Sequence, residues 1–158
     1  MEKKILAIDN DVEFLEDLEE MLNLGGYNPV TTNDSTAALS IALETKLDVI
    51  LTGIKMKGLS GFQVADRLNQ HIETADIPVI AISGHSIKKE HNRLMQMLGI
   101  KALIKKPFNP LDVISRIEMV SKKYSKVNGR LNLWQKKIKN LQADYYLNSQ
   151  IVLNAVKM

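Results

Sequence analysis

The stretch Asp48-Val-Ile-Leu-Thr-Gly53-Ile-Lys-Met-Lys-Gly58-Leu-Ser-Gly61-Phe62 contains a buried strand, a loop and the start of a helix. Its first part, residues 49–51, is the continuous apolar run typical of a central strand covered by helices on both faces. Glycines follow, and Ser60 stands at the N-cap position before apolar residues that repeat at helical spacing: Phe62, Val64, Ala65 and Leu68. We therefore predict a strand, a loop and a helix in this order.

The same pattern occurs five times along the chain. Apolar strands are predicted near residues 5–8, 30–32, 49–51, 78–82 and 101–104, and a helical pattern follows each of them. Gly25-Gly26 ends the first helix, and Asn33-Asp34-Ser35 caps the second. Five such units with short connections predict an α/β fold, a doubly wound five-stranded parallel sheet with helices on both faces.

The glycine-containing loop and the Ser60-Gly61-Phe62 helix start resemble the third strand and following loop of a response regulator receiver domain from two-component signal transduction. The resemblance covers about residues 3–120. It implies a flavodoxin-like sheet of order 2-1-3-4-5. It also divides the chain into a receiver-like domain, residues 1–120, and an extended C-terminal helix in residues 121–158, which is a coiled-coil extension or linker.

The resemblance also assigns the positions of the phosphorylation pocket. In that family the third strand ends in an aspartate that accepts a phosphoryl group, and Gly53 stands at this position. Asp9 matches the first of the paired acids after the first strand, whereas Asn10 replaces the second, which coordinates magnesium in the family. Ser83 and Lys106 match the hydroxyl and the lysine that contact the phosphoryl group. These matches imply a degenerate pseudo-receiver without a catalytic residue.

Two further departures point the same way. Leu103 replaces the Phe or Tyr that changes rotamer on activation, and Lys57 replaces a proline. Because magnesium prefers anionic oxygen ligands and Asn10 is neutral, we expect magnesium binding to be weak or absent, with Asp9 a weak candidate ligand. No other metal or cofactor is expected.

Several of these residues also have a structural interpretation. Ser83 is equally consistent with an N-cap of the next helix. Lys106 needs a nearby anion, for which Asp9 is the expected partner. Asp11 is interpreted as a first-turn acid that favours the helix dipole.

Composition excludes several classes of function. The chain has no cysteine, so disulfides and thiolate chemistry are excluded, and His71, His85 and His91 share no metal spacing. No nucleophile and base pattern or phosphate-binding glycine loop indicates an enzyme. The apolar run Ile5–Ile8 is too short for a signal peptide or membrane span, so we expect a cytoplasmic protein.

The last 38 residues differ from the rest in charge. Residues 1–120 hold 13 basic and 17 acidic residues, a net charge of −4, whereas residues 121–158 hold 8 and 1, a net charge of +7. From Ile117 and Val120 onward, apolar residues recur at steps of three and four and indicate a heptad seam. Its interaction positions are Leu131, Trp134, Ile138, Leu141, Tyr145 and Asn148. The seam predicts a homodimer, and the alternative is that it packs back on its own domain; Asn128-Gly129 either interrupts the helix or is passed by it.

Three functions are therefore considered. The first is a phosphorylation-independent module for protein interaction and dimerisation, which acts on signalling proteins or on its own output domain as the N-terminal part of a longer two-component protein. The second is a phosphorylation-competent receiver in which Gly53 replaces a native aspartate. The third is a nucleic-acid-binding regulator that uses the basic tail, which is less favoured because there is no room for a helix-turn-helix unit.

Overall fold

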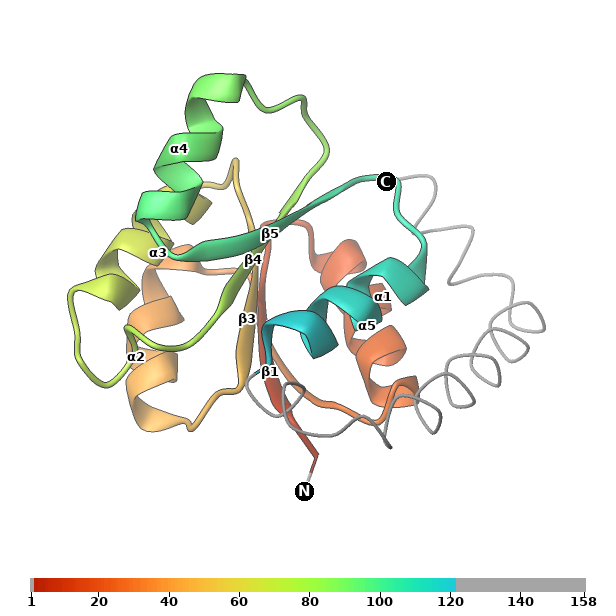
Figure 1. Ribbon diagram of the computed structural model, residues 1–158. Helices are drawn as coiled ribbons and strands as arrows, with labels where there is room; N and C mark the ends of the chain where they lie inside the picture. The colour runs from red at the N-terminus through yellow and green to blue at the C-terminus, as the bar shows by residue number, and fades with distance from the viewer. Residues whose placement is uncertain (1, 122–158) are drawn as a thin grey trace.

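The computed structural model describes residues 2–121, which form a five-stranded parallel sheet between two layers of helices (Figure 1). The strands are β1 (Lys4–Ile8), β2 (Asn28–Thr32), β3 (Val49–Gly53), β4 (Val79–Ser83) and β5 (Ile100–Lys105). Their order is β2-β1-β3-β4-β5, and every neighbouring pair is parallel. The predicted fold class and strand order are confirmed.

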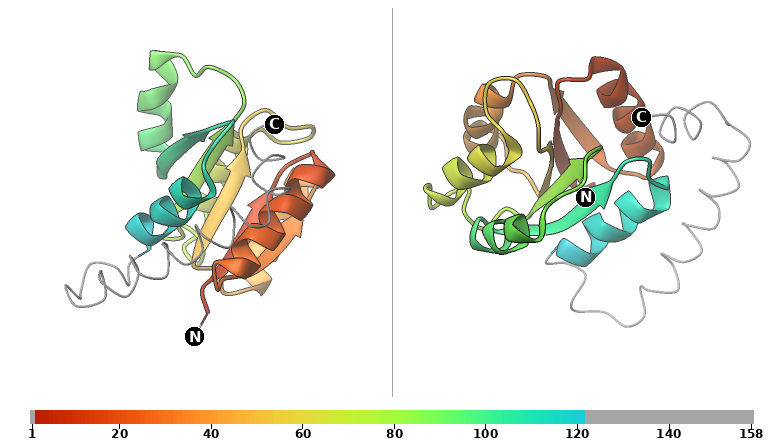
Figure 2. Two further views of the ribbon diagram at one scale, coloured as in Figure 1. Left: turned by 90° about the vertical axis from the view of Figure 1, so that its right-hand side faces the viewer. Right: turned by 90° about the horizontal axis from the view of Figure 1, so that it is seen from above.

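The helices cover both faces of the sheet. One layer holds α1 (Val12–Leu24) and α5 (Pro110–Val120), and the other holds α2 (Ala38–Glu44), α3 (Gly61–Asn69) and α4 (Lys89–Met97) (Figure 2). A 3-10 turn, η1 (Ser35–Ala37), precedes α2. Within residues 2–121, none of these helices has both the length and the apolar character that crossing a bilayer requires.

Each layer buries its own apolar core against one face of the sheet. The α1/α5 core contains Phe14, Leu15, Leu18, Met21, Leu22, Val113, Ile114 and Ile117. The other core contains Ala38, Ala42, Val64, Ala65, Leu68 and Met95. The predicted inward face of the fourth helix was partly wrong, because Met95 is buried while Leu94 is 38% exposed.

Side-chain caps fix where several helices begin. Ser60 caps α3 as predicted: its hydroxyl accepts a hydrogen bond from the Gln63 amide, and Gln63 reaches back to the Ser60 amide. Such a reciprocal box satisfies two amides that would otherwise lack helical partners. Asp11 was predicted to be a first-turn acid but is the N-cap of α1, where its carboxylate accepts from the Phe14 amide at 3.0 Å.

The seam predicted to run on from the last helix begins differently from the prediction. Ile117 is fully buried in the domain core, and α5 ends at Val120. Ser121 has extended backbone angles, φ −75° and ψ 125°, so no unbroken helix passes from α5 through this residue. The seam positions Leu131, Trp134, Ile138, Leu141, Tyr145 and Asn148, and the question about Asn128-Gly129, lie outside the described residues.

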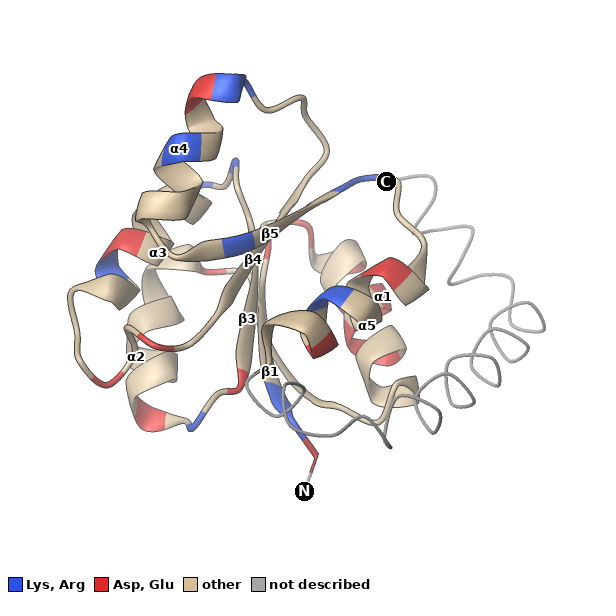
Figure 3. Cartoon of the chain, in the orientation of Figure 1, with Lys and Arg blue, Asp and Glu red and all other residues tan. Residues whose placement is uncertain are grey.

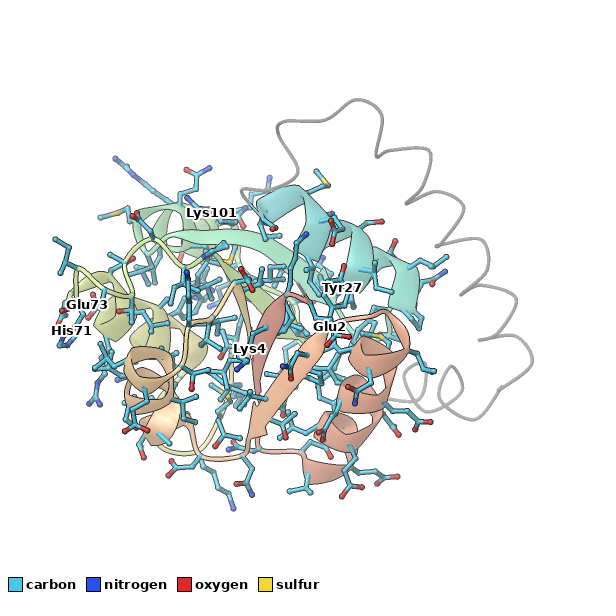
Figure 4. The ribbon with its side chains drawn as sticks, turned by 90° about the horizontal axis from the view of Figure 1, so that it is seen from below. Glu2, Lys4, Tyr27, His71, Glu73 and Lys101 are labelled. Carbon is cyan, nitrogen blue, oxygen red and sulfur yellow. The ribbon has the colours of Figure 1, made fainter. Side chains whose placement is uncertain are left out.

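A buried polar cluster ties the end of α5 to the rest of the domain. Lys3 Nζ lies 2.9 and 2.8 Å from the two carboxylate oxygens of Glu118, and the Tyr27 hydroxyl donates to Glu118 Oε1 at 2.6 Å. Figure 4 shows Tyr27 between α1 and α5. Burial, with the adjacent Glu118 carboxylate, raises the pKa of Tyr27 well above its ordinary value, so this hydroxyl remains a neutral donor.

Candidate functional site

The strand register brings the predicted pocket positions to one edge of the sheet. Ile8 pairs with Thr52, and Gly53 pairs with Ile82 on the next strand. Ser83 pairs with Lys105, the residue before Lys106. Because all five strands are parallel, the residues at their carboxyl ends share this edge, which is where ligands bind in such sheets.

Asp9 and Lys106 form an ion pair at the centre of this edge. Their Nζ and Oδ2 atoms are 3.4 Å apart, and both side chains are largely buried, 12% and 14% exposed. The other Asp9 oxygen accepts from the Asp11 amide at 3.0 Å. Lys106 Nζ also lies 3.6 Å from the centre of the Phe14 ring, so the ammonium interacts with the ring face as well. The predicted partnership of Lys106 with Asp9 is confirmed.

Gly53 lies buried in a space that its neighbours have filled. A Cβ atom at this position would stand 3.0 Å from Asp9 Oδ2 and 3.3 Å from both Cγ and Sδ of Met56. These distances are shorter than ordinary van der Waals contact, so any side chain here requires Asp9 and Met56 to move. The site therefore has no carboxylate at position 53 and no ready space for one.

Asn10 acts as a tie between three loops. Its Oδ1 accepts a hydrogen bond from the Lys57 amide in the β3–α3 loop, and its Nδ2 donates to the Asn33 carbonyl at 3.4 Å. An aspartate would keep the acceptor and lose the donor. The amide at position 10 therefore serves loop structure, and its oxygen is already engaged by a backbone donor.

Ser35 holds the same loop from the other side. Its buried hydroxyl donates to the Lys57 carbonyl and accepts from the Leu59 amide, both at 2.8 Å. Between these two residues, Gly58 has a φ of +78°, and a Cβ there would approach Ser35 Oγ to 3.0 Å. Glycine is required at this position because its φ is unfavourable for other residues and the serine is close.

Ser83 does not cap α4, so that interpretation was wrong. Its hydroxyl instead donates to the His85 carbonyl and accepts from the His85 amide, both at 3.1 Å, whereas α4 begins six residues later after Lys88. The backbone around Ser83 is tied to the pocket lysine, because the Lys106 amide donates to the Ser83 carbonyl at 2.8 Å. Leu103 is half-buried in β5 and packs with the α2/α3/α4 core.

Comparison with known families agrees with the fold and with the position of this edge. The model of the response regulator receiver domain matches residues 5–118. The chain belongs to this family. The phosphate regulon transcriptional regulatory protein PhoB of Pseudomonas aeruginosa is 29% identical over 119 residues, 75% of this chain and 51% of PhoB. The polar-differentiation response regulator DivK of Brucella anthropi is 28% identical over 109 residues, 69% of this chain and 88% of DivK.

Solved structures show the same fold. The chemotaxis protein CheY4 of Vibrio cholerae superposes with a TM-score of 0.72 at 22% identity, over 76% of this chain and 99% of CheY4. The chain spans about half the length of curated relatives such as PhoB. The receiver domain is therefore established, and the output that PhoB's name describes is not transferred to it.

The residues of this receiver do not fit a magnesium ion. Magnesium is bound in octahedral geometry by oxygen atoms, usually with one or two carboxylates. Asp9 has the one carboxylate among the pocket residues named above, and its two oxygens already contact Lys106 and the Asp11 amide. The oxygen of Asn10 accepts from the Lys57 amide. Within residues 2–121, no three His, Cys, Asp or Glu side chains form a group that could hold a metal.

Three residues of this site were missed by the sequence analysis. Phe14 reads there as a core residue, Met56 as a loop residue and Ser35 as part of a cap. In the receiver structure Phe14 faces the pocket lysine, Met56 fills the space beside Gly53, and Ser35 fixes the β3–α3 loop. The glycine at position 58, two residues from Met56, was the available signal for a tight loop at this edge.

Proposed function

We propose that this receiver domain is a signalling module that works through protein contact without phosphorylation at position 53. The observation that carries the proposal is Gly53, whose lack of a side chain removes the carboxylate that an acyl phosphate requires. The proposal includes the expectation that the domain is not an enzyme, and that its partners are signalling proteins or its own output domain.

The surroundings of Gly53 support this proposal. Met56 and Asp9 occupy the space in which a side chain at position 53 would lie. Lys106, which in an active pocket would meet a phosphoryl group, is satisfied by Asp9 and by the Phe14 ring. These contacts supply the pocket with the charge balance and packing that a ligand would otherwise provide.

The surface between α4 and β5 is the contact face that suits this function. A hollow of about 310 Å³ lies there, lined by Asn92, Met95, Gln96, Ile100, Lys101, Ala102 and Leu103. The neighbouring α4 residues Leu94 and Met97 are 38% and 74% exposed. Exposed apolar side chains beside a hollow are typical of protein contact surfaces.

The proposal is tested with acetyl phosphate and magnesium, followed by intact-mass measurement. The unmodified chain is expected to gain no phosphoryl group, because it offers no carboxylate at the end of β3. The double variant Asn10→Asp/Gly53→Asp, which returns both missing acids, is the matched comparison. A stoichiometric phosphoryl adduct on the unmodified chain, removed by hydroxylamine as an acyl phosphate is, would overturn the proposal.

A second candidate is a competent receiver in which Gly53 stands in place of an aspartate. The retained Ser83 and Lys106 favour it. The single variant Gly53→Asp separates the two: efficient phosphoryl uptake with Asn10 unchanged supports the second candidate. No uptake supports loss of the pocket as a whole, to which Asn10 also belongs.

Nucleic-acid binding stays the least favoured candidate. The described domain has more acidic than basic residues, and a negative surface repels phosphates. This candidate rests on the basic residues after 121, which lie outside the described part of the chain.

A further inference from the structure

We propose that the outer face of α1 is the docking surface for the basic segment 122–139 of the same chain. The outer face is defined by the exposed residues Val12, Glu13, Glu16, Glu20 and Leu24. This inference is independent of whether position 53 can be phosphorylated. It assigns a place to a segment that the sequence alone left between a dimer seam and a return to its own domain.

The charge of this face is one-sided. Residues 5–45 contain nine Asp and Glu and no Lys or Arg, and α1 carries acidic colour and no basic colour in Figure 3. Glu16 and Glu20 are four residues apart on the helix, where like charges destabilise by about 0.2–0.5 kcal/mol. A basic ligand on this face would relieve that repulsion.

Basic groups on the adjacent elements do not neutralise the face. Lys3 is paired with Glu118, and Lys106 is paired with Asp9. Arg116 on α5 is exposed and has an acidic residue, Asp112, one turn before it on the same helix. The outward acids of α1 thus face solvent in the described domain.

Apolar side chains stand at both ends of the acidic stripe. Val12 is 49% exposed and Leu24 is 42% exposed, and Met119 on the neighbouring α5 is 66% exposed. Segment 122–139 has the complementary composition: seven basic residues, no acidic residue, and the apolar residues Val127, Leu131, Trp134 and Ile138. Its lysines and arginine would meet the acids, and its apolar residues would cover the exposed apolar groups.

The segment begins beside this face. Glu118 in the last turn of α5 accepts from Tyr27, and the Tyr27 amide donates to the carbonyl of Leu22 in α1 at 3.0 Å. Ser121 follows within one turn, so residue 122 starts near the carboxyl end of α1. The 13 residues of α1 span roughly 20 Å, and the 18 residues of the segment span about 27 Å as a helix and more when extended.

The tether favours the same chain over a second copy. A short flexible connection gives a local concentration in the millimolar range, of order 1 mM, far above that of free protein in a dilute solution. The break of α5 at Ser121 also allows the chain to turn at that point. A parallel dimer built on a straight helix from α5 lacks this support.

Trp134, the chain's single tryptophan, reports directly on the segment. In the full chain at about 0.02 M NaCl its emission is expected to be blue-shifted and shielded from acrylamide. Raising NaCl to about 1 M, where screening acts over about 3 Å, should increase the quenching constant at least about twofold. The variant Glu16→Lys/Glu20→Lys should show that increase already at low salt, because Lys keeps the helix propensity of Glu and reverses its charge.

The matched control is Glu44→Lys/Glu73→Lys. It makes the same charge change at two exposed positions on the other side of the sheet, where Figure 4 shows Glu73 on the loop after α3. The control should behave like the unmodified chain. Combining Glu16→Lys/Glu20→Lys with Lys136→Glu/Lys137→Glu/Lys139→Glu should restore the shielding, which a merely misfolded variant would not do.

Two results would overturn the proposal. One is equal Trp134 quenching in the unmodified chain and in both charge variants at low salt. The other is shielding that grows over about a hundredfold range of protein concentration together with a dimer mass, which would assign the segment to a second copy. Shielding that does not depend on concentration, is lost with the α1 variant and is regained with the charge swap supports it.

Discussion

Replacing Gly61 by alanine is expected to lower the free energy of unfolding by about 2–3 kcal/mol, the range for forcing extra atoms into a packed region. A Cβ at Gly61 would lie 2.3 Å from the Gly53 carbonyl oxygen and 3.1 Å from Ile54 Cα. Both are backbone atoms of the site strand, so the first turn of α3 must move away. Alanine has the higher helix propensity, so the loss comes from this contact alone.

Chemical denaturation of Gly61→Ala beside Gly53→Ala measures this effect. At Gly53 the added methyl would meet the ends of two flexible side chains, Asp9 and Met56, which can shift. Gly53→Ala is therefore expected to change the unfolding free energy by less than about 1 kcal/mol. Equal losses in the two variants would show that the junction of β3 and α3 is not the tight backbone contact described here.

Replacing Glu118 by alanine is expected to cost about 2–4 kcal/mol. Glu118 is 5% exposed, although it lies on a helix of a surface layer, and its carboxylate binds both Lys3 and Tyr27. Alanine removes the acceptor of a buried hydroxyl and the counter-charge of a largely buried ammonium. Such groups are costly when their partner is removed, because the low-polarity surroundings give no replacement.

Thermal and denaturant unfolding of three variants isolates this effect. Glu118→Gln keeps hydrogen-bonding oxygen and removes the charge, so an intermediate loss is expected. Glu73→Ala removes an exposed carboxylate and should stay within about 0.5 kcal/mol of the unmodified chain. A loss below about 0.5 kcal/mol for Glu118→Ala would contradict the role assigned to the cluster, and would also weaken the tether that places residue 122 beside α1.

The sheet could be predicted from the sequence because each strand has its own local signal. The run 49–51 is apolar throughout and ends at Gly53, and the cap at Ser60 announces the next helix. The parallel order then places the strand ends together, which is why the meeting of Asp9 with Lys106 was predictable. In each case the determining contacts are short in sequence or follow from the topology.

Contacts between distant parts of the chain could not be predicted in this way. Glu118 has the pattern of a solvated helix acid, and its burial depends on residues 91 and 115 positions away. The interpretation of Ser83 as a cap failed because a longer loop intervenes before α4. Ile117 and Val120 fit a heptad spacing, but Ile117 is used by the domain core, since helical repeats in a core and in a seam share the same period.

The pocket gives the same lesson at the level of single atoms. The absence of an acid at position 53 is visible in the sequence, whereas the response of the neighbours is not. Met56 fills the space, Asn10 bonds the Lys57 amide, and Phe14 supports Lys106. Together these contacts make the edge of the sheet a packed and charge-balanced surface.

Fluorine NMR with beryllium fluoride and magnesium tests the central claim most directly. This reagent forms a phosphoryl-like adduct on an aspartate of a competent receiver pocket, and the adduct gives bound fluorine resonances. The unmodified chain is expected to show free fluoride species alone, with no change in its own amide spectrum at the β3–α3 loop. Saturable bound resonances at one equivalent of protein, accompanied by shifts of the Gly53 and Lys106 amides, would contradict the account.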